Sequence, residues 1–477
     1  MRNLSLLTDL YEFSMANGFQ QDLPATNATF DVFYRRVPDQ GSFVIAAGLQ
    51  QVVDAVRDFH FTTSDITYFR ELGLWSDAFL TSLSQFQFNC QLRAVPEGTP
   101  VFPREPLLTV TGPIAQAQLL ETLVLNILNH QSLIATKARR LTYAAAGRPI
   151  MEFGARRAQG PDSATYGTRA AVIGGATSTS NVQAGKQFNV PVAGTMAHSW
   201  IEAFPDELTA FRRWAHYYPD NSALLVDTYD VLNSGIPNAI TVFKELRQAG
   251  HEPVGIRIDS GDVAVLAEHA RKMLDDAGFP AAKITISNAL DEAIITSLLQ
   301  QGAPIDNFGI GEKLITSASA PVLSGVYKLA ATEIDGQLTP KIKVSASREK
   351  LTLPGKKQVY RLYHAGTRRA FADLIALETE TIMGTSTLAV YNSDPLSLNH
   401  QQRLQNFDVE PLLMPVVPSD FDQRSVQQIQ ADSQGRLAEL PAATQRLVNP
   451  DSYPVYITTD LYQLQTELVA KAVVHAN

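Results

Sequence analysis

The segment GIRIDSGD, at residues 255–262, holds an arginine and a carboxylate at a spacing that could bind an anionic substrate. Side chains alternate between the two faces of a β-strand, so Arg257 and Asp259 share one face while Ile256 and Ile258 share the other. If the isoleucines pack against a helix layer, the guanidinium and the carboxylate reach the carboxyl end of the strand, where parallel barrels carry their active sites. The alternative is a structural ion pair beside the N-cap of the helix that starts after Asp262.

A histidine follows another candidate strand in the segment VPVAGTMAHSW. His198 stands there among small residues such as Thr195 and could act as a nucleophile or as an acid–base group. A solvated or core histidine is the alternative. No HxxxH or HExxH spacing accompanies it, so the sequence predicts no metal site with direct protein ligands.

Three further segments could bind phosphate. A pair of arginines follows the strand in MEFGARRAQGP, and in GGATSTSN hydroxyl residues lead into a helix that begins near Asn181. In DNFGIGEK, Gly309 and Gly311 would let backbone N–H groups approach a phosphate, although the turn matches neither GxGxxG nor the Walker pattern. Ordinary helix capping is the alternative for each segment. Cationic side chains from these segments would gather at one edge of an otherwise acidic protein, which favours a polyanionic small molecule. They are Arg156, Arg157, Lys186, Arg257 and Lys313.

The elements that must position these residues alternate between short apolar strands and helical segments. The candidate strands are PIMEFG, VPVAGT, SALLVDT, PVGIRID, KITISN and DNFGIG. Their spacing of roughly 20 to 30 residues is typical of βα units and predicts a parallel sheet in a compact barrel of about six to eight strands.

The regions on either side of this alternation have a different pattern. Residues 1–115 mix strand-like pieces with a helical stretch near Leu49 to Phe59, which predicts an α+β region. A long helical pattern from Ala115 to Ala146 connects it to the barrel. Beyond Val326 the alternation is again strand-like, with a closing helix near residues 461–474. This last part is either a second portion of the N-terminal domain or an appended domain.

Composition excludes several classes of protein. The 477 residues carry a net charge of −9, which argues against non-specific binding to nucleic acid or to an anionic membrane. The single cysteine, Cys90, excludes an intramolecular disulfide framework, and its neighbours predict a buried thiol. No apolar run is long enough to cross a bilayer, and Asp9 and Glu12 interrupt any N-terminal signal peptide. We therefore expect a cytoplasmic protein with no membrane or nucleic-acid partner.

Several segments, in order along nearly the whole chain, resemble the nicotinate phosphoribosyltransferase family. They are TDLYEFSMANGF, EFGARRAQGPDSA, GTMAHSW, GIRIDSGD, TISNALDE, FGIGEKLITS with GVYKL, and LPAATQRLVNPDSYPVYIT. The resemblance implies an α/β fold, in which an irregular (β/α) barrel joins an α+β domain built from N- and C-terminal segments. It implies a reaction of nicotinate with phosphoribosyl pyrophosphate that gives nicotinate mononucleotide and pyrophosphate, coupled to ATP hydrolysis in NAD salvage. Mg²⁺ would act as cofactor, and a homodimer would share its active sites.

The resemblance also implies a role for individual residues. His198 would be transiently phosphorylated by ATP, and Asp259 would be the second catalytic residue, beside the phosphoribosyl moiety. The implied nicotinate-binding residues are Tyr11, reaching over from the neighbouring subunit, with Phe153, Thr195 and Arg257. The implied phosphoribosyl-binding residues are Arg156, Gly309 and Gly311. One position departs from some relatives, which carry a small hydroxyl residue where this chain has Glu312, and we leave Glu312 outside the predicted site.

The expected division of the chain is an N-terminal α+β domain at 1–115, a connecting helix at 116–148 and a barrel with the active site at 149–325. Residues 326–477 would complete the α+β domain and add a helical tail. Four alternatives stay open. Nicotinamide phosphoribosyltransferase shares the architecture, but the hydroxyl residues of ATSTSN favour a carboxylate substrate over an amide. A quinolinate phosphoribosyltransferase binds a dicarboxylate and should need more cationic side chains. A non-catalytic nucleotide sensor would have little need of His198 as a phosphate acceptor. A sugar-phosphate aldolase or isomerase would not explain the N-terminal tyrosine segment.

Overall fold

The computed structural model describes residues 3–385, 387–397, 400–421 and 423–475. The chain forms two compact units. We call one of them the terminal unit, which consists of Met1–Leu133, Val322–Arg424 and Ala431–Asn477. We call the other the central unit, which consists of Ile134–Pro321 and Ser425–Gln430. Among the described residues, no helix has the length and hydrophobicity needed to cross a bilayer.

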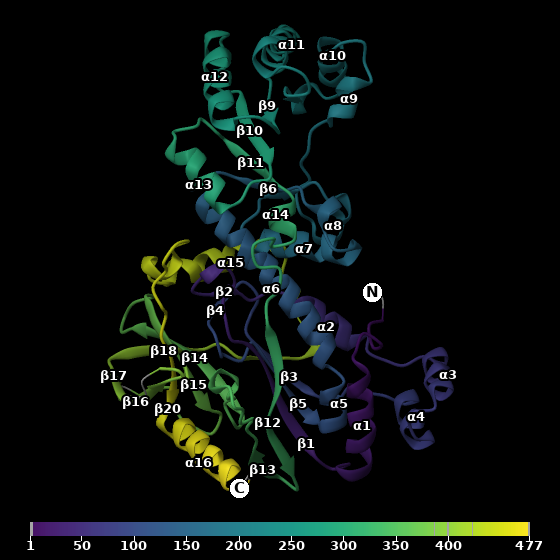
Figure 1. Ribbon diagram of the computed structural model, residues 1–477, viewed down its shortest axis with the longest axis vertical. Helices are drawn as coiled ribbons and strands as arrows, with labels where there is room; N and C mark the ends of the chain where they lie inside the picture. The colour runs from purple at the N-terminus through teal and green to yellow at the C-terminus, as the bar shows by residue number, and fades with distance from the viewer. Residues whose placement is uncertain (1–2, 386, 398–399, 422, 476–477) are drawn as a thin grey trace. The chain divides into compact units, whose positions relative to one another are not determined.

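Within the described part of the chain, the central unit is built on a six-stranded sheet in the order β7-β6-β11-β10-β9-β8 (Figure 1). Each neighbouring pair is parallel, as the βα spacing predicts. The strands are β6 (Ile150–Glu152), β7 (Ser178–Thr179), β8 (Ala223–Leu225), β9 (Gly255–Ile258), β10 (Lys283–Asn288) and β11 (Asn307–Ile310). Since β7 and β8 form the two edges, the expected irregular barrel is an open half-barrel.

One predicted strand is wrong. The segment VPVAGT, at residues 190–195, makes only an isolated parallel bridge between Val192 and Thr179. Pro191 has no N–H to donate to a ladder, so the segment pairs through its carbonyl oxygen and through Ala193 N–H. The sheet edge there is the two-residue strand β7, which is too short and polar to give a periodic signal.

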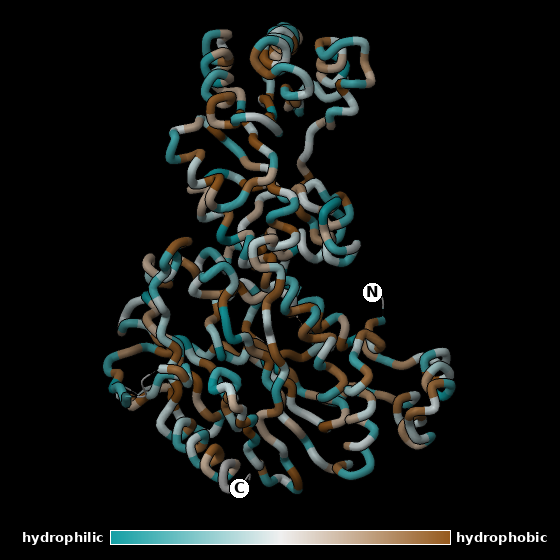
Figure 2. The backbone as a smooth tube through the Cα atoms, in the orientation of Figure 1, coloured by the Kyte–Doolittle hydropathy of each residue, from teal (hydrophilic) through white to brown (hydrophobic). Residues whose placement is uncertain are grey.

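Helices connect these strands and pack their apolar faces against the sheet, so hydrophobic and hydrophilic residues alternate along them in Figure 2. Asparagine or aspartate caps several of them: Asn181 accepts from Ala184 N–H at 3.2 Å, and Asp291 accepts from Ile294 N–H at 2.9 Å. The helical elements are η2 (Ala155–Arg157), α7 (Pro161–Ile173), α8 (Val182–Phe188), α9 (His198–Glu202), α10 (Glu207–Tyr217), η3 (Pro219–Asn221), η4 (Val231–Gly235), α11 (Ile236–Gln248), α12 (Val263–Asp276), α13 (Glu292–Gln300) and α14 (Glu312–Ile315).

The helix expected at 115–146 is interrupted near its start. A short helix α5 (Ile114–Gln118) precedes α6 (Glu121–Ala144), and Leu119 and Leu120 between them are buried. Helix α6 runs from the terminal unit into the central unit, so a helix connects the two units.

The terminal unit joins strands from both ends of the chain, as the fold class predicts. Among its described residues, one six-stranded sheet has the order β13-β12-β1-β5-β3-β19 and another has the order β17-β16-β20-β15-β14-β18. The N-terminal strands are β1 (Asn27–Tyr34), β2 (Val44–Ile45), β3 (Gln91–Ala94), β4 (Pro100–Val101) and β5 (Leu108–Pro113). The C-terminal strands are β12 (Gly325–Ile334), β13 (Gln337–Pro340), β14 (Lys357–His364), β15 (Ala370–Leu377), β16 (Thr387–Asn392), β17 (Gln402–Gln405), β18 (Phe407–Pro411), β19 (Met414–Val416) and β20 (Val455–Thr458).

Helices of both chain ends complete this unit. Apart from α5 and α6, they are α1 (Leu10–Asp22), η1 (Pro38–Gln40), α2 (Leu49–Arg57), α3 (Thr63–Leu72), α4 (Asp77–Ser84), η5 (Arg348–Lys350), η6 (Pro418–Asp420), α15 (Val426–Glu439), η7 (Ala442–Gln445) and α16 (Thr459–His475). Like α6, helix α15 runs across both units.

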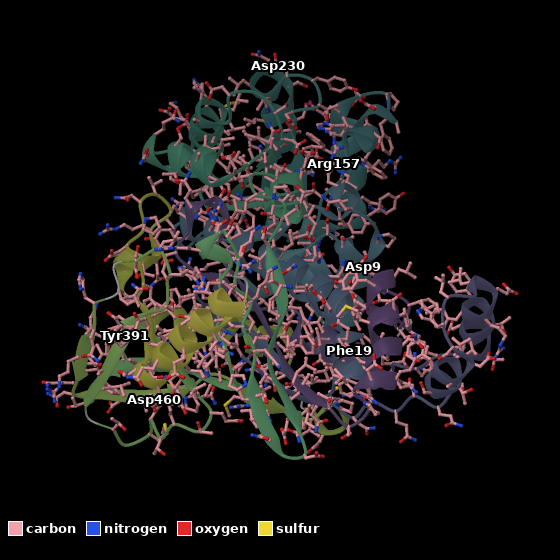
Figure 3. All side chains as sticks on the ribbon, turned by 60° about the horizontal axis from the view of Figure 1, so that its bottom comes forward. Asp9, Phe19, Arg157, Asp230, Tyr391 and Asp460 are labelled. Carbon is pink, nitrogen blue, oxygen red and sulfur yellow. The ribbon has the colours of Figure 1, made fainter. Side chains whose placement is uncertain are left out.

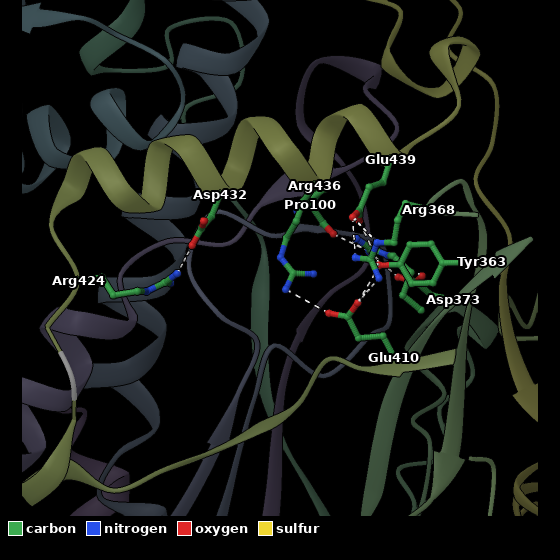
Figure 4. A network of polar contacts seen from close by, with 10 residues as sticks. Pro100, Tyr363, Arg368, Asp373, Glu410, Arg424, Asp432, Arg436 and Glu439 are labelled. Carbon is green, nitrogen blue, oxygen red and sulfur yellow. Dashed lines mark hydrogen bonds and ion pairs between the residues drawn. The ribbon is translucent and has the colours of Figure 1, made fainter. Parts of the chain in front are cut away.

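A buried polar network ties the N-terminal and C-terminal segments together (Figure 4). Arg361 on β14 is fully buried and donates to both carboxylate oxygens of Asp373 on β15, at 2.9 and 2.7 Å. Its guanidinium also donates to the carbonyl oxygen of Pro100 at 2.7 Å, and Tyr453 donates to Asp373 at 3.1 Å. Because an unpaired charge would be costly here, these contacts favour one arrangement of segments that lie 261 residues apart.

Cys90 is buried, as predicted, and packs against Gly112 of β5. Burial raises the pKa of its thiol to about 12, so only about one thiol in ten thousand is ionised at pH 8. We expect native protein to resist alkylation by iodoacetamide for hours at pH 8, while protein in guanidinium chloride reacts within minutes. Mass spectrometry of the alkylated chain measures both rates, and equal rates would contradict a buried thiol.

Candidate active site

The carboxyl end of β9 carries the arginine and the aspartate singled out in the sequence. Ile256 and Ile258 are fully buried, whereas Arg257 and Asp259 lie together on the other face. A guanidinium nitrogen of Arg257 donates to Asp259 Oδ1 at 3.0 Å. The strand alternation read from the sequence is therefore confirmed.

Arg257 is held by three polar contacts. Its Nε donates to Ser287 Oγ at 2.7 Å, one terminal nitrogen donates to Thr195 Oγ1 at 3.1 Å, and the other donates to Asp259. A guanidinium has five N–H donors, so one donor on each terminal nitrogen is left for a ligand. The guanidinium carbon lies 5.8 Å from the centre of the Phe153 ring. The site thus presents a fixed cation beside an aromatic face.

His198 is the first residue of α9 and belongs to the same group of side chains. Its Nδ1 lies 3.0 Å from Thr228 Oγ1, and its Nε2 lies 3.9 Å from Asp259 Oδ2. Its side chain is 40% exposed, so the imidazole is oriented by the protein and open to solvent. Such a ring can exchange a phosphoryl group or a proton with a bound ligand.

Phe153 follows β6 and lies against β11, where two glycines make room for it. Its N–H donates to the carbonyl oxygen of Ile310 at 2.8 Å. A Cβ atom on Gly309 would lie 2.6 Å from a carbon of the Phe153 ring, and a Cβ on Gly311 would lie 3.2 Å from the Phe153 carbonyl oxygen. Glycine at 309 is therefore required by packing, independently of any phosphate.

The arginines after β6 lie at the surface of the central unit. Arg156 and Arg157 are both exposed in η2, and Figure 3 labels Arg157. Arg157 Nε lies 3.7 Å from Glu312 Oε2. Both side chains of this pair are more than half exposed. Glu312 therefore faces a cation from η2, and neither group is committed to the core.

Tyr11 lies on α1 of the terminal unit. Its side chain is 45% exposed, and partial burial together with the Glu121 and Glu12 carboxylates raises the pKa of its phenol above the usual range. The phenol is therefore neutral at physiological pH, and its ring is accessible.

Sequence reasoning missed several polar residues that organise the site. Asp227, which follows β8, is buried and accepts from Asp259 N–H at 2.9 Å and from Ser260 Oγ at 2.6 Å. Glu152 at the end of β6 is fully buried and accepts from Thr168 and Thr179 hydroxyls at 2.8 and 2.7 Å. The sequence contained a signal for these residues, because Asp227 and Glu152 each stand at the end of an apolar strand. Ser287 and Thr228 occupy the same kind of position.

The described residues include no group of three or more histidine, cysteine, aspartate or glutamate side chains that could hold a metal ion. Mg²⁺ usually binds through one or two carboxylates, water and substrate phosphates. The partly exposed carboxylate of Asp259 fits a magnesium ion that arrives with a phosphorylated substrate.

An open parallel sheet whose carboxyl edge presents an arginine, an oriented histidine and an aromatic ring defines an α/β-barrel enzyme for an anionic small molecule. Three family models match the chain: the nicotinate phosphoribosyltransferase N-terminal domain over residues 6–129, the family itself over 149–359 and the C-terminal domain over 356–465. The chain belongs to the nicotinate phosphoribosyltransferase family of enzymes.

Individual relatives agree with these models. The chain is 42% identical to the nicotinate phosphoribosyltransferase of Bacillus subtilis, over 96% of this chain and 94% of that protein. It is 32% identical to the human nicotinate phosphoribosyltransferase, over 98% and 96% of the two chains. The crystal structure of the human enzyme matches with a TM-score of 0.83 at 30% identity, covering 97% of this chain and all of that one. A nicotinate-nucleotide pyrophosphorylase from Pyrococcus furiosus, at 22% identity and a TM-score of 0.68, shares the fold.

Proposed function

We propose that the protein joins nicotinate to the phosphoribosyl group of phosphoribosyl pyrophosphate, forming nicotinate mononucleotide and pyrophosphate in NAD salvage, with ATP hydrolysis coupled to the reaction. The observation that carries this proposal is the arrangement of Arg257. Three contacts hold its guanidinium beside Phe153, and two of its N–H groups remain for a ligand.

Nicotinate matches this arrangement because it combines a carboxylate with a flat aromatic ring. The two remaining N–H groups of Arg257 bind the carboxylate in charge-assisted hydrogen bonds, and Thr195 holds the guanidinium in place. Phe153 stacks on one face of the pyridine ring. Tyr11 of a second copy covers the other face in a homodimer with shared active sites.

The transfer itself needs positioning more than acid–base chemistry. The pyridine nitrogen uses its lone pair to form a bond to the anomeric carbon of the ribose, and the carbon–oxygen bond to pyrophosphate breaks. Positive charge develops on the ribose, and Asp259 lies close enough to the site to stabilise it. Arg156 and the backbone N–H of Gly311, which follows β11, bind the phosphate oxygens, and Gly309 within β11 contributes by its lack of a side chain. Mg²⁺, when bound, neutralises the leaving pyrophosphate.

His198 couples ATP hydrolysis to this reaction. Its imidazole takes the γ-phosphoryl group as the bond from phosphorus to the ADP oxygen breaks, and water later releases that group as phosphate. The contacts with Thr228 and Asp259 hold the ring for both steps. A cytoplasmic location belongs to the proposal, since ATP is a co-substrate.

Substrate selectivity tests the assignment. The carboxylate that contacts the ATSTSN segment, Glu152, is buried and saturated by internal donors, so the site offers no carboxylate there to accept from an amide NH₂. We expect kcat/KM for pyrophosphate release to be at least about tenfold higher with nicotinate than with nicotinamide, in the presence of phosphoribosyl pyrophosphate, Mg²⁺ and ATP. Comparable values for the two substrates would overturn the assignment to nicotinate.

A further inference from the structure

We propose that Ser287 is a positioning residue, which holds Arg257 and Asp259 as one rigid pair and thereby sets the affinity for the nicotinate carboxylate. This inference rests on the proposed function. Ser287 lies on β10, next to β9, and is 3% exposed. It touches both members of the pair: its hydroxyl oxygen accepts from Arg257 Nε at 2.7 Å, and its hydroxyl donates to Asp259 Oδ1.

The direction of these two hydrogen bonds is fixed by chemistry. A guanidinium only donates and an ionised carboxylate only accepts, so the hydroxyl must accept from Arg257 and donate to Asp259. Together with the direct contact at 3.0 Å between Arg257 and Asp259, this closes a triangle of charge-assisted hydrogen bonds. Ser287 is therefore the neutral group that fixes the orientation of both charged ones.

This triangle decides which N–H groups of Arg257 face a ligand. With Nε committed to Ser287, the guanidinium plane is held, and the free donors are those on the terminal nitrogens. Without the hydroxyl, Nε and Asp259 Oδ1 each lose a partner, and the guanidinium can rotate towards the carboxylate. Nicotinate would then bind to an arginine that must first be reoriented.

Space around Ser287 suits a small hydroxyl residue. Ser287 pairs with Gly309 of β11, and a Cβ on that glycine would lie 3.4 Å from Ser287 Cβ. The Phe153 ring fills the space that Gly309 leaves, so the side chain at 287 must stay small on this side. The strand also offers a matched control: Thr285 lies two residues earlier on the same face, and its hydroxyl accepts from Asn307 Nδ2 at 3.3 Å.

A double-mutant cycle, in which the KM for nicotinate is measured, tests this role. We expect Ser287→Ala to raise this KM about tenfold in the parent and less than twofold in an Arg257→Ala background, because the serine acts through the arginine. Thr285→Val, the matched control, should leave the KM for nicotinate within twofold of the parent. If Ser287→Ala does not fold, Ser287→Cys, which keeps the volume but is a weak hydrogen-bonding group, takes its place with the same expectation.

Two outcomes would overturn the positioning role. One is an unchanged KM in Ser287→Ala, and the other is an equal increase with and without Arg257. Both are distinct from failure of the proposed function, in which the parent itself would show no nicotinate-dependent release of pyrophosphate and the inference would fall with it.

Discussion

Replacing His198 with alanine is expected to reduce ATP hydrolysis at least about a thousandfold, equivalent to roughly 4 kcal/mol of barrier, because the variant lacks the imidazole that we propose accepts the phosphoryl group. Nucleotide synthesis should continue more weakly, since Arg257 and Phe153 still bind the pyridine. The side chain is 40% exposed, so its loss leaves no large cavity and the fold should persist. Phosphate release from ATP measures the first effect, and product chromatography measures the second.

The control for this variant is His216→Ala, which removes an exposed histidine of α10 from the same unit. It should hydrolyse ATP as the parent does. Incubation with ATP labelled at the γ-phosphate should leave acid-labile label on the parent and on His216→Ala, and none on His198→Ala. If His198→Ala hydrolyses ATP at the rate of the parent, His198 is not the residue that is phosphorylated.

Replacing Arg257 with alanine is expected to raise the KM for nicotinate about 100-fold, equivalent to roughly 2.7 kcal/mol. The variant loses the charge-assisted contact with the substrate carboxylate and leaves Asp259 and Ser287 with one partner fewer. Arg257→Lys should recover only part of this loss, because a point charge cannot keep the contacts to Ser287, Thr195 and Asp259 together. Initial rates over a range of nicotinate concentrations give both values.

Arg212→Ala is the matched control, since Arg212 is an exposed cation of the same unit that pairs with Glu245. Its KM should stay within twofold of the parent. If the KM of Arg257→Ala for nicotinate stays within about twofold of the parent, a difference below 0.5 kcal/mol, the arginine does not bind the substrate carboxylate.

Local chemistry explains why the central sheet could be anticipated. The segments that became β6, β8, β9, β10 and β11 are apolar runs that end in polar or small residues, and burial of both faces of a parallel strand produces that pattern. Strand β7 was not predicted, because a two-residue edge strand has no period. The VPVAGT segment matched the pattern but was wrongly predicted as a strand, since Pro191 cannot donate to a ladder and the segment makes only an isolated bridge. The placement of Arg257 and Asp259 on one face at the end of β9 follows from the same alternation.

The sequence could not predict which side chains are in contact. The contact between Ser287 and the Arg257–Asp259 pair depends on the register of β9 against β10, and the need for glycine at 309 depends on where the Phe153 ring packs. Strand order is set by long-range packing that no local pattern encodes. The same holds for the buried Arg361–Asp373 pair, whose contact with Pro100 spans most of the chain.

The sequence by itself determined the family, the alternating architecture and the residue types of the site, because motif identity and side-chain periodicity are local properties of the chain. The tertiary structure decided that the barrel is open, that Arg257 is fixed by three hydrogen bonds and that His198 is oriented by Thr228. Those features are distances between side chains from different strands, and only packing of the whole sheet sets them.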